Sequence, residues 1–173
     1  MKTYKIKTTG KSLLELYEQY GVGSSGFYSS DPWWKNESFA GEKPPAGEYE
    51  LYFDRALTGK TYSEQVKELQ KGFDPVHIAI IAEAVLIHFK ETEERLLEDL
   101  YVRSNSFNSN GYRVSVGHFD ADGLLVNDWD GNYRLYDTGL SAARKLGDLN
   151  ESLNLESAIK IVKEAGYRVI KEM

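Results

Sequence analysis

The segment "DPVHIAIIAEAVLIHF" (74–89) constrains the fold more than any other stretch of the sequence. Its apolar residues occupy nearly every side of a helix, which is typical of a helix buried in a protein core. We expect the helix to span 74–89, with Asp74 as its cap and Pro75 at its first helical position. Glu83 interrupts the apolar run, which is too short to cross a bilayer. Other elements of the chain must therefore cover this helix.

Strand and helix patterns on either side of this segment predict an α+β fold. At 173 residues the chain has the length of a single domain. We expect residues 1–100 to form a scaffold with three helices. The elements predicted in it besides the buried helix are a strand at 3–8, a helix at 11–20, a strand at 48–53, a helix at 63–73 and a charged, partly helical connector at 91–100.

A long segment between the first helix and the second strand, 21–47, is rich in Gly, Ser, Pro and aromatic residues. This composition predicts an ordered loop. Tryptophans clustered in such a loop usually pack on the core, so we expect Trp33 and Trp34 of "DPWW" to pin it there.

The C-terminal part changes character at residue 101. Three short strands are predicted at 112–119, 123–128 and 133–140, with turn signals at Asp122-Gly123 and Asp130-Gly131. Residues 101–146 are therefore expected to form a strand-and-loop segment. A terminal helix (154–166) and strand (167–172) are predicted within residues 147–173.

Charge and cysteine content exclude several classes of function. The net charge is −6 and no run of Lys and Arg opposes it, which disfavours nucleic-acid binding. With no cysteine, the chain has no disulfides, thiolate zinc sites or cysteine nucleophiles. The sequence shows neither a signal peptide nor a transmembrane segment, so we expect no membrane insertion and a cytoplasmic or virion-associated protein.

Motifs for cofactors and metals fail on their context. "GVGSSG" (21–26) follows a helix and opens a loop, whereas a dinucleotide-binding motif follows a strand and opens a helix. "ALTGKT" (56–61) lacks the first glycine of a phosphate-binding loop. The Asp-Gly turns resemble half of a calcium loop, but neither frame supplies ligands at both ends. We therefore predict no cofactor and no metal.

The amino-acid composition of residues 99–144 is the second feature that constrains the interpretation of this sequence. This window contains no Lys, Glu, Gln or Met, although an even distribution of the 36 such residues in the chain would place about ten there. Strands and turns disfavour Glu and Lys, but a complete absence is still unusual. Apart from Trp129, every residue of the window belongs to the amino acids encoded by codons ending in C.

This pattern resembles the variable proteins of diversity-generating retroelements, whose C-terminal segment is rewritten by adenine-directed mutagenesis, largely at AAC asparagine codons. The resemblance runs through 101–146, where "VR", "VG", "GL" and "GLSAARKL" alternate with Asn, Ser, Tyr, Asp, His and Phe. It extends to 77–103, which is similar to versions from uncultivated microbes. The resemblance implies a C-type lectin-like fold whose variable side chains bind diverse ligands.

Alternation along the predicted strands separates inward from outward positions. Val114, Val116, Leu124 and Val126 are expected to face the core. The "GLSAARKL" segment (139–146) is expected to be scaffold, with Arg144 in a structural ion pair or hydrogen bond. The predicted ligand-binding residues are Phe107, Asn108, Tyr112, Ser115, His118, Asp120, Leu125, Asn127, Trp129, Asp130, Asn132, Tyr133, Leu135 and Tyr136.

Two functional hypotheses remain open. The first is a non-catalytic protein that binds a macromolecular or cell-surface ligand, with a protein as the leading candidate, through aromatic and Asp/Asn side chains. The alternative is a small enzyme or metal-dependent module that uses Asp120, Asp122, Asp128 and Asp130. A binding surface should leave these four carboxylates apart and solvated, whereas a catalytic site should bring at least two together in a pocket.

Overall fold

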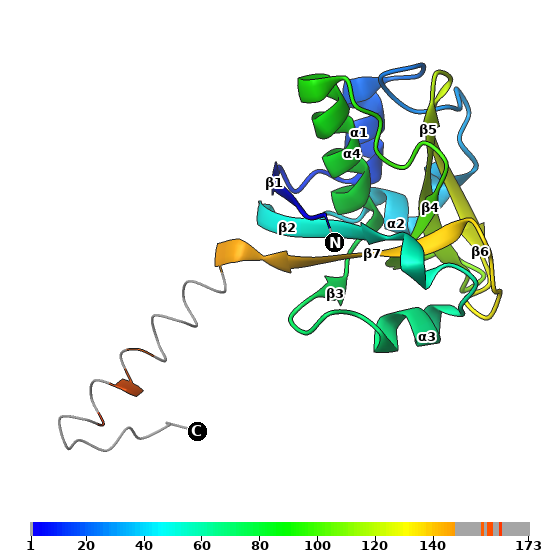
Figure 1. The fold of residues 1–173 in the computed structure, drawn as a ribbon. Helices are drawn as coiled ribbons and strands as arrows, with labels where there is room; N and C mark the ends of the chain where they lie inside the picture. Colours follow the sequence, from blue (N-terminus) through cyan, green and yellow to red (C-terminus); the bar gives the residue numbers. More distant parts are fainter. Residues whose placement is uncertain (1, 148–156, 158, 161–162, 164–173) are drawn as a thin grey trace.

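The apolar segment forms helix α4 (Ile78–Thr92) in the computed structural model, which describes residues 2–147, 157, 159, 160 and 163 (Figure 1). The first nine residues of α4 are all buried, as the sequence predicts. The predicted start of the helix was wrong. Asp74 and Pro75 form the short strand β3 (Asp74–Pro75), and His77 caps the helix by accepting a hydrogen bond from Ala79 N. Proline suits both positions, because it is tolerated in a helix's first turn and also at the edge of a sheet.

A seven-stranded sheet runs through the molecule in the order β1-β2-β7-β4-β5-β6, with β3 paired to β7 outside this path. Its longer strands are β1 (Tyr4–Thr8), β2 (Gly47–Asp54), β4 (Tyr101–Phe107), β5 (Arg113–Asp120), β6 (Gly123–Trp129) and β7 (Thr138–Lys145). All pairs are antiparallel except β4 with β7. Figure 1 shows a strong twist, so that β2 and β7 run crosswise to β4, β5 and β6.

The two faces of the sheet carry different helices. Helices α1 (Leu13–Tyr20) and α4 lie side by side on one face and enclose the main core, which includes Val102 of β4 (Figure 1). Arg103, the next residue, points to the opposite face because side chains alternate along a strand. There it bonds Gln65 of α3 (Tyr62–Lys67). Helix α3 therefore covers the part of the second face that β4 and β7 form.

Shorter elements complete the N-terminal half. They are the helical segments η1 (Trp33–Asn36), α2 (Ser38–Gly41) and η2 (Arg55–Leu57). Glu83, buried in α4, links that helix to the segment between β1 and α1. Its carboxylate accepts bonds from the backbone nitrogen (3.1 Å) and the hydroxyl (2.5 Å) of Thr9. The polar residue that interrupts the apolar run is thus satisfied inside the core.

Most predicted strands and helices in the described residues are confirmed, and the errors lie at their ends. The helix predicted at 63–73 stops at Lys67, and α4 continues to Thr92, after which the rest of the 91–100 connector is not helical. The strand predicted at 133–140 begins only at Thr138, while β4 was not predicted. The helix and strand expected at 154–172 lie outside the described residues, apart from 157, 159, 160 and 163. In the described part of the chain, no helix has the length and apolar character needed to cross a bilayer.

Candidate recognition surface

Half of the predicted ligand-binding positions lie in strands β4, β5 and β6, and the other half lie in the loops that follow β4 and β6. As predicted, Val114, Val116, Leu124 and Val126 are buried on the core face of these strands. Three cross-strand rows lie on the second face: Tyr101, Gly117 and Leu125; Arg103, Ser115 and Asn127; and Phe107, Arg113 and Trp129. The alternation of side chains therefore separates the core from a second, partly exposed surface.

An aromatic cluster formed by Tyr101, His118 and Trp129 lies on this surface. The ring centroid of Tyr101 is 4.4 Å from that of His118 and 4.9 Å from that of Trp129. Burial raises the pKa of the Tyr101 hydroxyl, and a hydrogen bond with the Asn127 side chain opposes that shift. Three separate strands thus hold these rings in fixed relative positions.

An irregularity in β5 directs His118 into the cluster. The register between β5 and β6 shifts between Gly117 and Asp120, and His118 has a φ of 45°. The shift brings the chain against Leu100, whose carbonyl oxygen accepts a bond from His118 N (3.3 Å) and would lie only 2.0 Å from a Cβ on Gly117. Glycine is therefore required at 117, and such bulges are a common way to redirect a side chain.

Ser115 was predicted to contact ligand, and this prediction was wrong, because the residue is completely buried. It lies in the sheet between Arg103 and Asn127, in the row between those of Tyr101 and Trp129. Because the rings of Tyr101 and Trp129 meet each other, we infer that they close over the small serine side chain. Alternation places Ser115 on the correct face but does not show that its larger neighbours cover it.

Residues 130–137, which we call the recognition loop, connect β6 to β7. The hydrogen bonds that fix its main chain include Gly59 N to Leu135 O (2.7 Å), Tyr62 N to Gly131 O (2.8 Å), Tyr101 N to Asp137 O (2.8 Å), Arg103 Nη2 to Tyr133 O (2.7 Å) and Asn132 N to Asp130 Oδ1 (2.8 Å). Its aromatic side chains remain free, with Tyr133 56% and Tyr136 91% exposed. The loop thus combines a fixed backbone with exposed aromatic rings.

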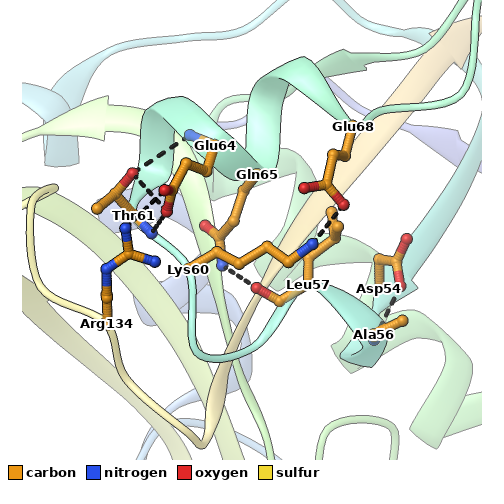
Figure 2. A network of polar contacts seen from close by, with 9 residues as sticks. All are labelled: Asp54, Ala56, Leu57, Lys60, Thr61, Glu64, Gln65, Glu68 and Arg134. Carbon is orange, nitrogen blue, oxygen red and sulfur yellow. Dashed lines mark hydrogen bonds and ion pairs between the residues drawn. The ribbon is translucent and has the colours of Figure 1, made fainter.

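Helix α3 and the turn before it contact the loop through Arg134 (Figure 2). Thr61 and Glu64 form a capping box at the start of α3, and the same Glu64 carboxylate accepts a bond of 2.6 Å from Arg134 in the loop. The backbone bond from Thr61 and the contact with Arg134 lower the pKa of Glu64 to about 2. One carboxylate therefore links the helix cap to the recognition loop.

Arg103 connects this support to the sheet. Its guanidinium is fully buried and donates to Lys60 O (3.0 Å), Gln65 Oε1 (3.0 Å) and Tyr133 O (2.7 Å). Burial lowers the pKa of Arg103. Gln65 in turn donates to Leu57 O, as Figure 2 shows. No carboxylate among the described residues pairs with this cation, so its charge is balanced only by backbone and amide oxygens.

A second loop, 107–112, joins β4 to β5 and has the same organisation. Asn108 was predicted to bind ligand, but it is buried, and its Oδ1 accepts bonds from Asn110 N and Tyr112 N (both 2.9 Å). Because the Asn108 side chain is buried and holds its own turn, it is a structural residue, which corrects this prediction. Phe107 and Tyr112, at the two ends of the loop, are exposed.

Two contacts hold this second loop from outside. Asn108 Nδ2 donates to Asp128 of β6 at 2.5 Å, and Glu37 accepts bonds from the backbone nitrogen (2.8 Å) and hydroxyl (3.0 Å) of Ser109. Burial, followed by the nearby charge of Glu37, raises the pKa of Asp128. Asp128 is therefore a structural acceptor for the 107–112 loop.

A groove of about 290 Å³ beside β6 extends the surface beyond the predicted segment. Leu125 and Asn127, both predicted contacts, line it together with Tyr28 and Trp33 of the 21–47 loop. The two tryptophans of "DPWW" have different roles: Trp34 is 2% exposed, whereas Trp33 is 44% exposed and donates from Nε1 to Val126 O (2.9 Å). The sequence predicted this loop only as a support, so Tyr28 and Trp33 were missed as surface residues.

The remaining predicted site residues lie at the surface or partly buried in it. Phe107, Tyr112, Asn132, Tyr133 and Tyr136 are exposed, whereas His118, Asp120, Leu125, Asn127, Trp129, Asp130 and Leu135 are partly buried. Arg103 and Tyr101 were not predicted as organisers of the surface, although "VR" was assigned to the scaffold. Arg144 was predicted to make a structural ion pair, and it does so with Glu50 at 2.6 Å.

The four carboxylates of the alternative hypothesis do not meet. Asp120 and Asp122 lie at the turn of the β5–β6 hairpin, whereas Asp128 and Asp130 lie at its other end, since Asp120 pairs with Gly123 and Val114 with Asp128. Asp120 and Asp130 each accept a bond from the backbone nitrogen two residues later. Across the described ranges, no group of three or more His, Cys, Asp or Glu side chains is arranged to hold a metal ion.

Comparisons with known proteins identify no relative of this chain, so its class rests on the geometry described above. No family model, no curated protein and no solved structure matches the chain. The class of protein that the fold and the surface define is therefore an α+β protein with an aromatic, polar surface built on rigid loops.

Proposed function

We propose that this protein is a non-catalytic ligand-binding protein whose recognition surface comprises the second face of β4–β6, the recognition loop and the 107–112 loop. The observation that carries the proposal is that both loops combine a fixed main chain with exposed aromatic side chains. Their main chains are fixed by hydrogen bonds to the scaffold, while Phe107, Tyr112, Tyr133 and Tyr136 remain exposed. Such a surface can change its side chains without losing its fold.

The chemistry of the exposed residues supports binding to a macromolecule. Tyrosine offers a large amphipathic contact area and loses little conformational entropy, and Asn, Ser and Asp add adaptable hydrogen bonds. A surface pre-organised in this way avoids part of the entropic cost of association. A protein ligand, in solution or on a cell surface, fits this combination best.

We further propose that the scaffold is C-type lectin-like and that a retroelement diversifies the segment 101–146. The support is the separation of the buried residues of 139–146, which form β7 in the middle of the sheet, from the exposed residues of 130–137. Sequencing the DNA on both sides of the coding region tests this part. A near-copy of the segment encoding 104–144, differing at adenines and close to a reverse transcriptase, is the expected finding, and its absence contradicts diversification.

A display experiment tests binding itself. One library varies Phe107, Tyr112, Asn132, Tyr133 and Tyr136 among Tyr, Ser, Asn and Asp. A matched library varies exposed positions outside the proposed surface, namely Lys5, Lys7, Glu18, Gln19 and Glu48. Both libraries are selected against the same panel of folded proteins. We expect folded binders from the first library alone, whereas unfolding of that library, or equal success of both, contradicts the proposal.

A further inference from the structure

The arginines of the recognition surface are engaged within the protein itself. Residues 101–137 contain three Arg, five Asp and no Lys or Glu. Arg103 is buried, as described above. Arg113 lies over the ring of Tyr62 at 4.1 Å and donates to Asn105 O, and Arg134 pairs with Glu64. None of the three arginines is thus left free to receive an anionic partner.

Most of the aspartates, by contrast, lack a cationic partner. Within the described part of the chain, Asp120, Asp122 and Asp130 form no ion pair, and Asp137 lies 3.9 Å from His118 Nε2. Asp137 is exposed and Asp120 is partly exposed. With five Asp against three Arg, of which Arg103 is buried and Arg134 is paired with Glu64, residues 101–137 carry a net negative charge.

The aromatic cluster lies next to two of these carboxylates. Asp137 is close to His118, and both Asp120 and Asp137 are near enough to Tyr101 to disfavour ionisation of its hydroxyl. His118 stacks on Tyr101, and its Nε2, shielded from solvent, has no hydrogen-bond partner. Flat rings beside carboxylates are the setting in which a planar guanidinium binds well, because it stacks on the rings and donates in a fork to a carboxylate.

We propose that the recognition surface binds a basic segment of a protein partner, with an arginine side chain against the rings of His118 and Trp129 and its guanidinium donating to Asp137, while Asp120 adds long-range attraction. This inference rests on the proposed function and specifies the chemistry of the partner. Charge complementarity favours an arginine-containing polypeptide over an acidic one, and it should also accelerate association.

Selection from a random 12-residue peptide library on the folded full-length protein tests the inference. The same library is selected on D120N/D137N, in which the amides keep their acceptor oxygens, and on E18Q/E48Q, which changes the net charge equally at exposed positions outside the surface. We expect arginine-rich peptides from the wild type and E18Q/E48Q. Their affinity should fall at least about 10-fold on D120N/D137N, the scale of one lost charge-assisted contact.

The outcomes separate this inference from the proposed function. Peptides without basic residues that lose affinity on Y133A/Y136A overturn the inference and leave the proposed function standing. Equal loss of arginine-rich peptides on both charge variants shows attraction to net charge alone and also overturns it. If no peptide is enriched on any variant, the inference and the proposed function both fail. A further variant, H118N, tests the stacking contact. Asn tolerates the positive φ of this position, so the variant should stay folded. We expect it to bind arginine-rich peptides more weakly than the wild type does.

Discussion

The buried side chain of Arg103 donates a 2.7 Å hydrogen bond to the carbonyl oxygen of Tyr133, whose own side chain is 56% exposed. A residue hidden in the sheet therefore positions the backbone of a residue that faces solvent. This contact joins the scaffold to the recognition loop, and it holds the backbone of the loop without using the Tyr133 side chain.

Replacing Arg103 with Met should release the recognition loop. The change removes the donor of the buried Gln65 Oε1 and of the partly buried carbonyl oxygens of Lys60 and Tyr133. It also removes a buried charge that has no carboxylate partner among the described residues. Since each orphaned acceptor costs about 1–3 kcal/mol, we expect a net loss of about 2–4 kcal/mol in unfolding free energy. Hydrogen exchange should accelerate first at the amides of Gly59 and Tyr62, which bond the loop.

The matched control for this change is Arg134→Met. Arg134 also contacts the loop, but its side chain is largely exposed and its ion pair with Glu64 is at the surface. We expect a loss below about 1 kcal/mol, as is usual for exposed pairs. Equal destabilisation by the two substitutions, measured by urea unfolding, would contradict the assigned role of Arg103.

The stability of the protein should depend on Glu64 in a defined pH range. The pKa of Glu64 is about 2 in the folded protein, against a reference value of 4.5. A carboxyl group with a lowered folded pKa stabilises the fold above its unfolded pKa and loses this contribution as the pH falls through the folded value. The difference in melting temperature between wild type and E64Q should therefore be constant above about pH 5.5 and shrink between about pH 4.5 and 2.

Glu18→Gln is the control for this pH dependence. Glu18 is exposed on α1, and its side chain forms no hydrogen bond or ion pair within the described residues. Its melting temperature should follow that of the wild type at every pH. If the difference in melting temperature between wild type and E64Q does not shrink in acid, the capping box and the Arg134 contact do not stabilise the ionised carboxylate.

The local patterns of the sequence predict the buried helix, the core face of β5 and β6, and the exposure of the recognition loop, because each depends on periodicity or turn chemistry. They do not predict that Ser115 and Asn108 are buried, since this depends on which large side chains from other strands lie over them. Tyr28 and Trp33 were missed for the same reason. They lie beside β6 although they precede it by about a hundred residues, and a local sequence pattern cannot predict a contact between segments so far apart in the chain.

Asn108 should behave as a structural residue rather than as a contact residue. Asn108→Ala removes the acceptor for two backbone nitrogens and the donor to Asp128, so we expect a loss of about 2–3 kcal/mol. The neighbouring exposed residue gives the control, and Asn110→Ala should cost less than about 0.5 kcal/mol. Chemical denaturation of both variants distinguishes this role from the ligand contact predicted by the sequence.

The two tryptophans of "DPWW" allow a buried structural residue, Trp34, to be compared with an exposed candidate contact residue, Trp33. Trp34 is buried against Phe27 and Tyr17, with ring centroids 5.7 and 5.6 Å away, so Trp34→Ala should cost about 3–5 kcal/mol. Trp33→Phe keeps a ring beside the groove and loses only the bond to Val126 O, for which we expect about 0.5–1.5 kcal/mol. If Trp33 belongs to the recognition surface, Trp33→Phe should weaken a ligand selected on the wild type by more than its effect on stability explains. A binding affinity unchanged by this variant would limit the surface to the 101–137 segment, because the groove beside β6 would then contribute nothing to recognition.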